Sequence, residues 1–112
     1  MVINKNSELI SASTIKVWDI NRGERLKTLN GHTDYVRSIV LTENEELISA
    51  SDDRTIKIWN LKTGLCEKTL IGYTNFIKSL ILTKNGELVS ASDDTTIKIW
   101  NLTTSECKQT LV

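Results

Sequence analysis

The sequence of 112 residues has no proline, no excess of charge of either sign and no long hydrophobic run. Fourteen Lys and Arg balance fourteen Asp and Glu, which argues against nucleic acid or an anionic membrane as the main partner, because both require a clustered basic surface. No apolar stretch approaches the roughly 20 residues that span a bilayer, and the segment after Met1 has no secretory-signal pattern. We therefore expect a globular protein of a reducing compartment that is not attached to membranes.

Histidine and cysteine are also scarce. His32 is the only histidine, and Cys66 and Cys107 have a spacing that fits no metal motif. No glycine-rich phosphate loop, nucleophile elbow or zinc-ligand spacing occurs in the sequence. We therefore expect no enzymatic activity, no metal ion and no cofactor.

The dominant feature that is present is an internal repeat of 41 residues. Trp18, Trp59 and Trp100 lie 41 residues apart, and residues 31–71 align with residues 72–112 without a gap, with 24 identities in 41 positions. Identical neighbouring units can bury one another's faces, which is the physical reason for such repetition. The two aligned segments are therefore the second and third units of the chain.

Residues 1–30 form a degenerate and shortened first unit. Residues 8–13 match residues 46–51, but three residues are then missing, because Ser13 runs straight into Thr14 where the later units insert a turn. The start of this unit is shortened as well, so that it has lost most of its first strand. We expect it to be the least stable of the three units.

Within each unit the hydrophobic pattern has a period of two, and β-branched residues are frequent, as is typical of strands. Clusters of Asn, Asp, Thr and Gly separate these short runs and indicate turns. The sequence therefore predicts an all-β protein of four-stranded antiparallel meanders. The predicted strands of the second unit are residues 36–41, 47–51, 55–59 and 66–70.

Two aspartate pairs, Asp52-Asp53 and Asp93-Asp94, resemble the paired carboxylates of acid–base or metal chemistry. They recur at the same predicted turn of each full unit, and aspartate favours turns. A structural role is therefore the preferred interpretation of the pairs.

The repeated motifs of the second unit are Gly31-His32, the SASDD segment at 49–53 and the TIKIWN segment at 55–60. The third unit repeats them 41 residues later with a tyrosine in the histidine position, and the first keeps Ser11 and the Trp18-Asp19 pair. Together these motifs resemble the WD-repeat β-propeller family over almost the whole chain. The resemblance implies an open arc of about three blades, or a part of a larger or oligomeric propeller, since roughly four to eight blades close a ring.

The resemblance also implies that a hydrogen-bonded chain of Asp, His, Ser and Trp pins each blade. An indole N–H only donates, whereas an imidazole and a hydroxyl can each donate and accept, so such a chain is chemically consistent. A phenol has a different reach from an imidazole, which leaves open whether the network of the third unit closes. The residues assigned to this structural network are His32, Ser49, Asp53 and Trp59, then Tyr73, Ser90, Asp94 and Trp100, and in the first unit Ser11 and Trp18.

The same resemblance implies an upper surface at which propellers bind peptides. Tyrosine and arginine are residue types that supply binding hot spots. The alternative also stays open, in which these aromatic side chains only cover strand ends and the basic side chains are merely solvated. The candidate partner-binding residues are Tyr35, Arg37, Asp52, Phe76, Lys78 and Asp93.

The resemblance thus implies a non-catalytic protein–protein interaction module of the cytoplasm, or of the nucleus: a scaffold or adaptor that presents a propeller surface to a protein or peptide. One alternative is a homo-oligomer that closes a ring, because an open arc leaves two apolar blade faces uncovered. Another is a regulatory or substrate-receptor part of a larger complex, such as a ubiquitin ligase. The shortened first unit and the end of the chain at a repeat boundary favour missing further blades.

Overall fold

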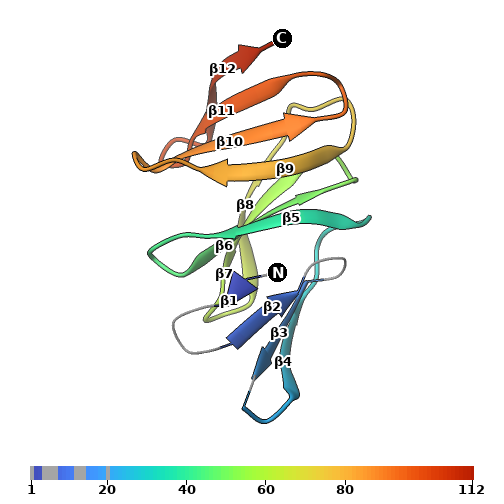
Figure 1. Ribbon diagram of the computed structural model, residues 1–112, viewed down its shortest axis with the longest axis vertical. Coiled ribbons are helices and arrows are strands. Elements are labelled where there is room, and N and C mark those ends of the chain that lie inside the picture. The colour runs from blue at the N-terminus through green and yellow to red at the C-terminus, as the bar shows by residue number, and fades with distance from the viewer. Residues whose placement is uncertain (1, 4–7, 12–14, 20) are drawn as a thin grey trace.

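The computed structural model describes the backbone of residues 2–3, 8–11, 15–19 and 21–112, and the side chains of residues 15–19 and 21–112. Three four-stranded antiparallel sheets are stacked along the longest axis of the molecule (Figure 1). The strands of each sheet are adjacent in chain order, so each sheet is a meander. The predicted all-β architecture is confirmed. In the described ranges, no helix is long and apolar enough to cross a membrane.

The strand boundaries of the second unit differ from the predicted ones by at most one residue at either end. The local period and the turn residues were therefore sufficient to locate them. The first sheet contains β1 (Val2–Ile3), β2 (Glu8–Ser11), β3 (Ile15–Asp19) and β4 (Glu24–Leu29), the second contains β5 (Val36–Leu41), β6 (Glu46–Ser51), β7 (Ile56–Asn60) and β8 (Leu65–Leu70), and the third contains β9 (Ile77–Leu82), β10 (Glu87–Ser92), β11 (Ile97–Asn101) and β12 (Glu106–Leu111).

Apolar side chains between neighbouring sheets form two cores. Alternation along each strand sends one set of side chains toward the previous sheet and the other set toward the next. Burial of these sets is the main force that holds the stack together, at roughly 25 cal/mol per Å² of apolar surface. Between the first and second sheets the core includes Ile15, Val17, Leu29, Val36, Ile39, Leu47 and Trp59. Between the second and third it includes Ile48, Ile56, Ile58, Leu70, Ile77, Leu80, Leu88 and Trp100.

Lysine side chains add a polar link between neighbouring sheets. Lys27 on β4 donates from Nζ to the backbone carbonyls of Leu61 and Lys62, the latter at 2.9 Å. Its equivalent on β8, Lys68, donates to the carbonyl of Leu102 at 3.0 Å. The same contact therefore recurs at both sheet–sheet interfaces.

Candidate functional site

Four side chains of the second unit form a continuous hydrogen-bonded chain. Trp59 donates from Nε1 to Ser49 Oγ at 2.8 Å, and Ser49 Oγ lies 2.7 Å from His32 Nε2. On the other side of the ring, His32 Nδ1 lies 2.8 Å from Asp53 Oδ2. A neutral imidazole with its proton on Nδ1 gives every group a partner, because Ser49 then donates to Nε2 and Nδ1–H donates to the carboxylate.

Charge and burial favour this arrangement at neutral pH. Burial opposes ionisation of Asp53, but hydrogen bonds from the Thr55 hydroxyl, from His32 and from the backbone N–H groups of Thr33 and Thr55 outweigh it and lower its pKa to about 2. Burial lowers the pKa of His32 below its usual value, although Asp53 acts in the opposite direction. An ionised carboxylate therefore holds a neutral imidazole. Both ring nitrogens are engaged within the unit, and Ser49, whose hydroxyl lies beside Nε2, is fully buried.

Close packing against the indole explains the glycine that precedes this histidine. A Cβ atom on Gly31 would lie 2.9 Å from Cη2 of Trp59, which is closer than such atoms approach in folded proteins. The indole therefore packs directly on the backbone of the loop that carries His32.

In the third unit the equivalent side chains form two separate hydrogen-bonded groups instead of one chain. Trp100 donates from Nε1 to Ser90 Oγ at 2.9 Å, while the Tyr73 hydroxyl contacts Ser90 Oγ and donates to the Ser90 carbonyl at 2.8 Å. Asp94 instead accepts from the hydroxyl and backbone N–H groups of Thr96, at 2.5 and 3.0 Å, and from Thr74. No hydrogen bond between described residues joins Tyr73 to Asp94. The phenol therefore bonds the serine of the network and leaves the aspartate to the two threonines.

The first unit is described in part. Trp18 lies on β3 at the position of Trp59 on β7, and it is half-buried where Trp59 is buried. Ser11 ends β2, and its side chain lies outside the described residues. The assignment of both to a structural network stays a prediction.

At the same end of the second sheet, Arg37 is fixed between an acid and an aromatic ring. Its Nε and Nη2 donate to the two oxygens of Asp52 at 2.9 and 2.6 Å, and its Cζ lies 5.5 Å from the centroid of the Tyr35 ring. These hydrogen bonds lower the pKa of Asp52. The Asp52 carboxylate is buried in this pair, while Tyr35 is 62% exposed.

The third sheet carries a looser copy of this arrangement. Lys78 Nζ lies 3.7 Å from Asp93 Oδ2 and 5.6 Å from the centroid of the Phe76 ring, and Phe76 is 39% exposed. The two copies lie close together, because they stand at the starts of β5 and β9, which contact one another. After Arg37, Lys78 also contributes to the lowered pKa of Asp52. The structure thus brings all six candidate partner-binding residues into one surface, which we call the upper patch: Tyr35, Arg37, Asp52, Phe76, Lys78 and Asp93.

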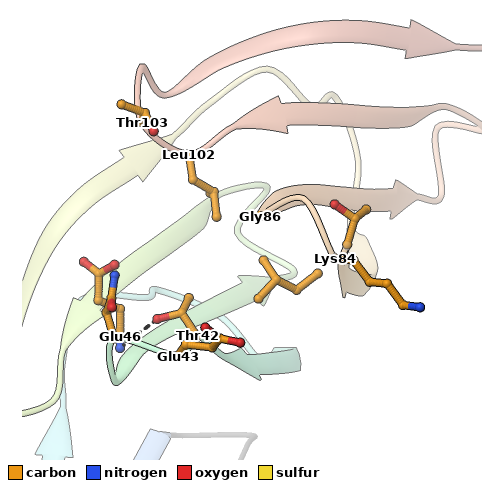
Figure 2. A pocket seen from close by; sticks show the side chains of 10 residues that line it. Thr42, Glu43, Glu46, Lys84, Gly86, Leu102 and Thr103 are labelled. Atoms are coloured by element: carbon orange, nitrogen blue, oxygen red, sulfur yellow. Dashed lines mark hydrogen bonds between the residues drawn. The ribbon is translucent and has the colours of Figure 1, made fainter.

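A groove of about 490 Å³ opens at the other end, between the hairpins of the second and third sheets (Figure 2). Leu102 points into it from the third sheet, and Thr42 and Glu43 line the opposite wall. The sequence pattern did not indicate this groove, because it forms only where turns from separate units meet. Among the residues whose positions are described, no cluster of His, Cys, Asp or Glu could hold a metal ion.

Comparison with known proteins decides the family. The pattern of the WD40 family, described as "WD domain, G-beta repeat", matches residues 23–60 and 64–101, about two thirds of the chain. The chain belongs to the WD40 repeat family. Each match begins with the last strand of one sheet and ends with the third strand of the next, so one WD40 sequence repeat connects two neighbouring sheets.

Individual WD40 proteins resemble parts of the chain. A WD repeat-containing protein of Schizosaccharomyces pombe is 51% identical over 35 residues, 31% of this chain and 10% of that protein. The nuclear distribution protein PAC1 of Ajellomyces capsulatus is 56% identical over 43 residues, 38% of this chain and 9% of that protein. The crystal structure of the WD40 β-propeller domain of Doa1 superposes with a TM-score of 0.90 and 30% identity, over 99% of this chain and 38% of that one.

These comparisons define what kind of protein this is. The three stacked sheets have the structure of part of a WD40 propeller, and WD40 propellers are in general non-enzymatic scaffolds for protein interaction. The chain spans about a tenth of the length of the two WD-repeat relatives it matches.

Proposed function

We propose that this chain is a non-catalytic interaction module that binds a protein or peptide through the upper patch. One observation carries the proposal: each complete unit presents an exposed aromatic ring beside a cation at the same end of the stack, Tyr35 with Arg37 and Phe76 with Lys78. Aromatic residues and arginine are the types that most often supply binding energy at interfaces.

The geometry of the upper patch favours binding in two ways. Arg37 is already held by Asp52 and by the Tyr35 ring, so it loses little conformational freedom when a partner arrives. Tyr35 remains largely exposed although most large apolar side chains of the second sheet are buried between sheets. The fold therefore does not require an aromatic ring at this position.

Charge in the upper patch is balanced. Arg37 and Lys78 are offset by Asp52 and Asp93, with which they form ion pairs. We therefore expect the partner to be recognised by stacking and hydrogen bonds with the aromatic rings and the cations, rather than by a high net charge of its own.

Quantitative affinity capture with the tagged chain tests this function. We expect proteins retained by the wild-type chain to be lost from the Tyr35→Ala/Phe76→Ala double variant and kept by Leu65→Ala. Leu65 is an apolar residue at the opposite end of the second sheet that is 66% exposed, so its replacement controls for non-specific apolar contact.

With the captured partner purified, Tyr35→Ala and Arg37→Ala should each weaken binding by more than about 1 kcal/mol in a calorimetric titration. Unchanged affinity in the single alanine variants of Tyr35, Arg37, Phe76 and Lys78 would rule out the upper patch as the binding surface.

A further inference from the structure

The groove between the hairpins of the second and third sheets is a second candidate binding surface. It lies at the end of β5 that is opposite the upper patch, and its walls come from two sheets whose four strands are all described (Figure 2). Its volume of about 490 Å³ falls within the roughly 300–1,000 Å³ that is typical of ligand pockets. We call it the hairpin groove, and among the residues that line it are Thr42, Glu43 and Glu46 of the second sheet and Leu82, Leu102 and Thr103 of the third.

Two leucines supply the apolar part of the hairpin groove. Leu82 and Leu102 pack against the core between the second and third sheets, but both are only partly buried. The equivalent of Leu102 in the second unit, Leu61, is 7% exposed. Figure 2 shows the side chain of Leu102 pointing into the groove. An apolar group in the groove would therefore bury leucine surface that the packing of the sheets leaves accessible.

Hydrogen bonds to the preceding sheet distinguish the turn of Leu102 from the turn of Leu61. Lys27 donates from Nζ to the carbonyls of both Leu61 and Lys62, whereas the described bond of Lys68 goes to the carbonyl of Leu102 alone. The turn that carries Leu102 is therefore held to its neighbouring sheet at one carbonyl instead of two.

The charge that faces the hairpin groove is mainly acidic. Glu43 and Glu46 lie on the wall of the second sheet. Lys84 belongs to the opposite wall, and its ammonium points away from Leu102 (Figure 2). Lys68 lies near Glu46, but its ammonium already donates to the carbonyl of Leu102 at 3.0 Å.

The surroundings of Glu46 favour an additional cation. Burial and the neighbouring carboxyl of Glu67 raise the pKa of Glu46, although Lys68 acts in the opposite direction. The negative charge of Glu46 is thus incompletely compensated by the groups around it. A cation from a partner would stabilise the ionised carboxylate.

We propose that the hairpin groove binds a short segment of another protein in which a long apolar side chain stands next to a lysine or an arginine. The apolar side chain contacts Leu82 and Leu102, and the cation pairs with the carboxylates of Glu43 and Glu46. Charge complementarity identifies this occupant, because an apolar floor beside two carboxylates accepts a segment with an apolar group beside a positive charge. The surface is separate from the upper patch and adds a second contact to the proposed function.

A bead-bound library of random hexapeptides, screened with the labelled 112-residue chain, tests the proposal. We expect a group of retained peptides to carry leucine, methionine or phenylalanine next to lysine or arginine, and to be lost with the Glu43→Gln/Glu46→Gln double variant. The Glu24→Gln/Glu106→Gln variant changes the net charge equally at exposed residues that do not line the groove, and it should retain these peptides. Circular dichroism should show that both variants are folded.

Heteronuclear NMR titration with one of these peptides locates the site. The backbone amides of Thr42, Gly86 and Thr103 should shift, and those of Tyr35 and Lys78 should not. Replacing the basic residue of the peptide by glutamate, or its apolar residue by serine, should each weaken binding at least about tenfold, because each removes one half of the expected contact.

Three results would overturn the proposal: a library with no peptide whose retention depends on Glu43 and Glu46, shifts confined to the upper patch, or unchanged affinity of the peptide that carries glutamate. The outcome is separate from that of the proposed function. Tyr35→Ala/Phe76→Ala should still retain the peptides of the hairpin groove, and Glu43→Gln/Glu46→Gln should not change binding of a partner to the upper patch.

Discussion

At the scale of single residues, the side chain at position 32 or 73 decides whether the hydrogen-bonded chain that starts at the tryptophan reaches the aspartate. The imidazole of His32 has two ring nitrogens and reaches both Ser49 and Asp53. The hydroxyl of Tyr73 is one group at the end of a ring; it bonds Ser90, and no hydrogen bond between described residues joins it to Asp94. Two units that share most of their sequence therefore differ in how their loops are held.

Replacing His32 by tyrosine should copy the third network into the second unit. His32→Tyr should lower the free energy of unfolding by about 1–3 kcal/mol, because Asp53 loses a buried hydrogen-bond partner. Urea denaturation followed by tryptophan fluorescence measures this. Tyr73→Phe is the comparison variant, since it removes the hydrogen bonds between the phenol and Ser90 but leaves the bonds of Asp94 to Thr74 and Thr96 in place. Equal stability of His32→Tyr and the wild type would contradict the structural role of the imidazole.

Stability should also depend on pH through the same residues. Because the pKa of His32 is lowered in the folded state, the unfolded chain binds more protons once the pH falls below the usual histidine value of about 6.5, and the free energy of unfolding then decreases. Asp53 and Asp94 have a pKa of about 2, so a second decrease should begin near the usual aspartate value of about pH 4.

Urea denaturation at a series of pH values should resolve the two decreases. The first should be absent from His32→Tyr, which contains no histidine, and the second should remain. A wild-type free energy of unfolding that stays constant from neutral pH to about pH 5 would contradict the expected behaviour of His32.

Glu45 occupies a backbone conformation that suits glycine. Its φ is 61°, and the equivalent residue of the third unit is Gly86, with φ 78°. Glu45 Oε1 is also buried, and no described group forms a hydrogen bond with it. Glu45→Gly should therefore raise the free energy of unfolding by up to about 1 kcal/mol. The reverse change, Gly86→Glu, should lower it, and thermal denaturation of both variants checks the two signs.

At the scale of secondary-structure elements, the first sheet begins with the shortest described strand. β1 has two residues and pairs with β2 at Val2–Ile10 and Ile3–Leu9, whereas β5 has six residues. Among the described residues, β2 therefore has fewer backbone partners on that side than β6 has. The lower stability of the first unit stays a prediction.

Native-state hydrogen exchange should separate the sheets. Amides of β2 and β3 should exchange faster than those of β6 and β7, because opening the first sheet breaks fewer contacts than opening the second, which lies between two others. The third sheet, which also lies at an end of the stack but has four full-length strands, serves as the internal comparison. Equal protection of β2–β3 and β6–β7 would show that the first sheet is as stable as the second.

At the scale of the whole molecule, packing of sheet on sheet leaves the upper patch accessible. This packing buries one face of the first sheet, both faces of the second and one face of the third. The upper patch consists of loop and strand-end residues that lie outside both cores.

Local patterns in the sequence are enough to predict the strands, the turns and the residue types of the hydrogen-bonded Asp-His-Ser-Trp chain. These depend on local alternation, on turn-forming residues and on a spacing of 41, all of which are visible along one chain. Even the position of Arg37 and Lys78 two residues after an aromatic ring could be recognised as a repeated feature.

Which of these residues contact one another depends on how the loops and sheets pack in three dimensions. Three features depend on distances between loops that are far apart in the sequence. They are the separation of Tyr73 from Asp94 in the third unit, the burial of Asp52 against Arg37, and the groove between the hairpins of the second and third sheets. Ile56 and Ile97 have the same side chain and the same immediate neighbours in sequence, yet one is buried and the other is exposed. The physical reason is that burial depends on whether another sheet lies against the face, and that is a property of the assembled stack.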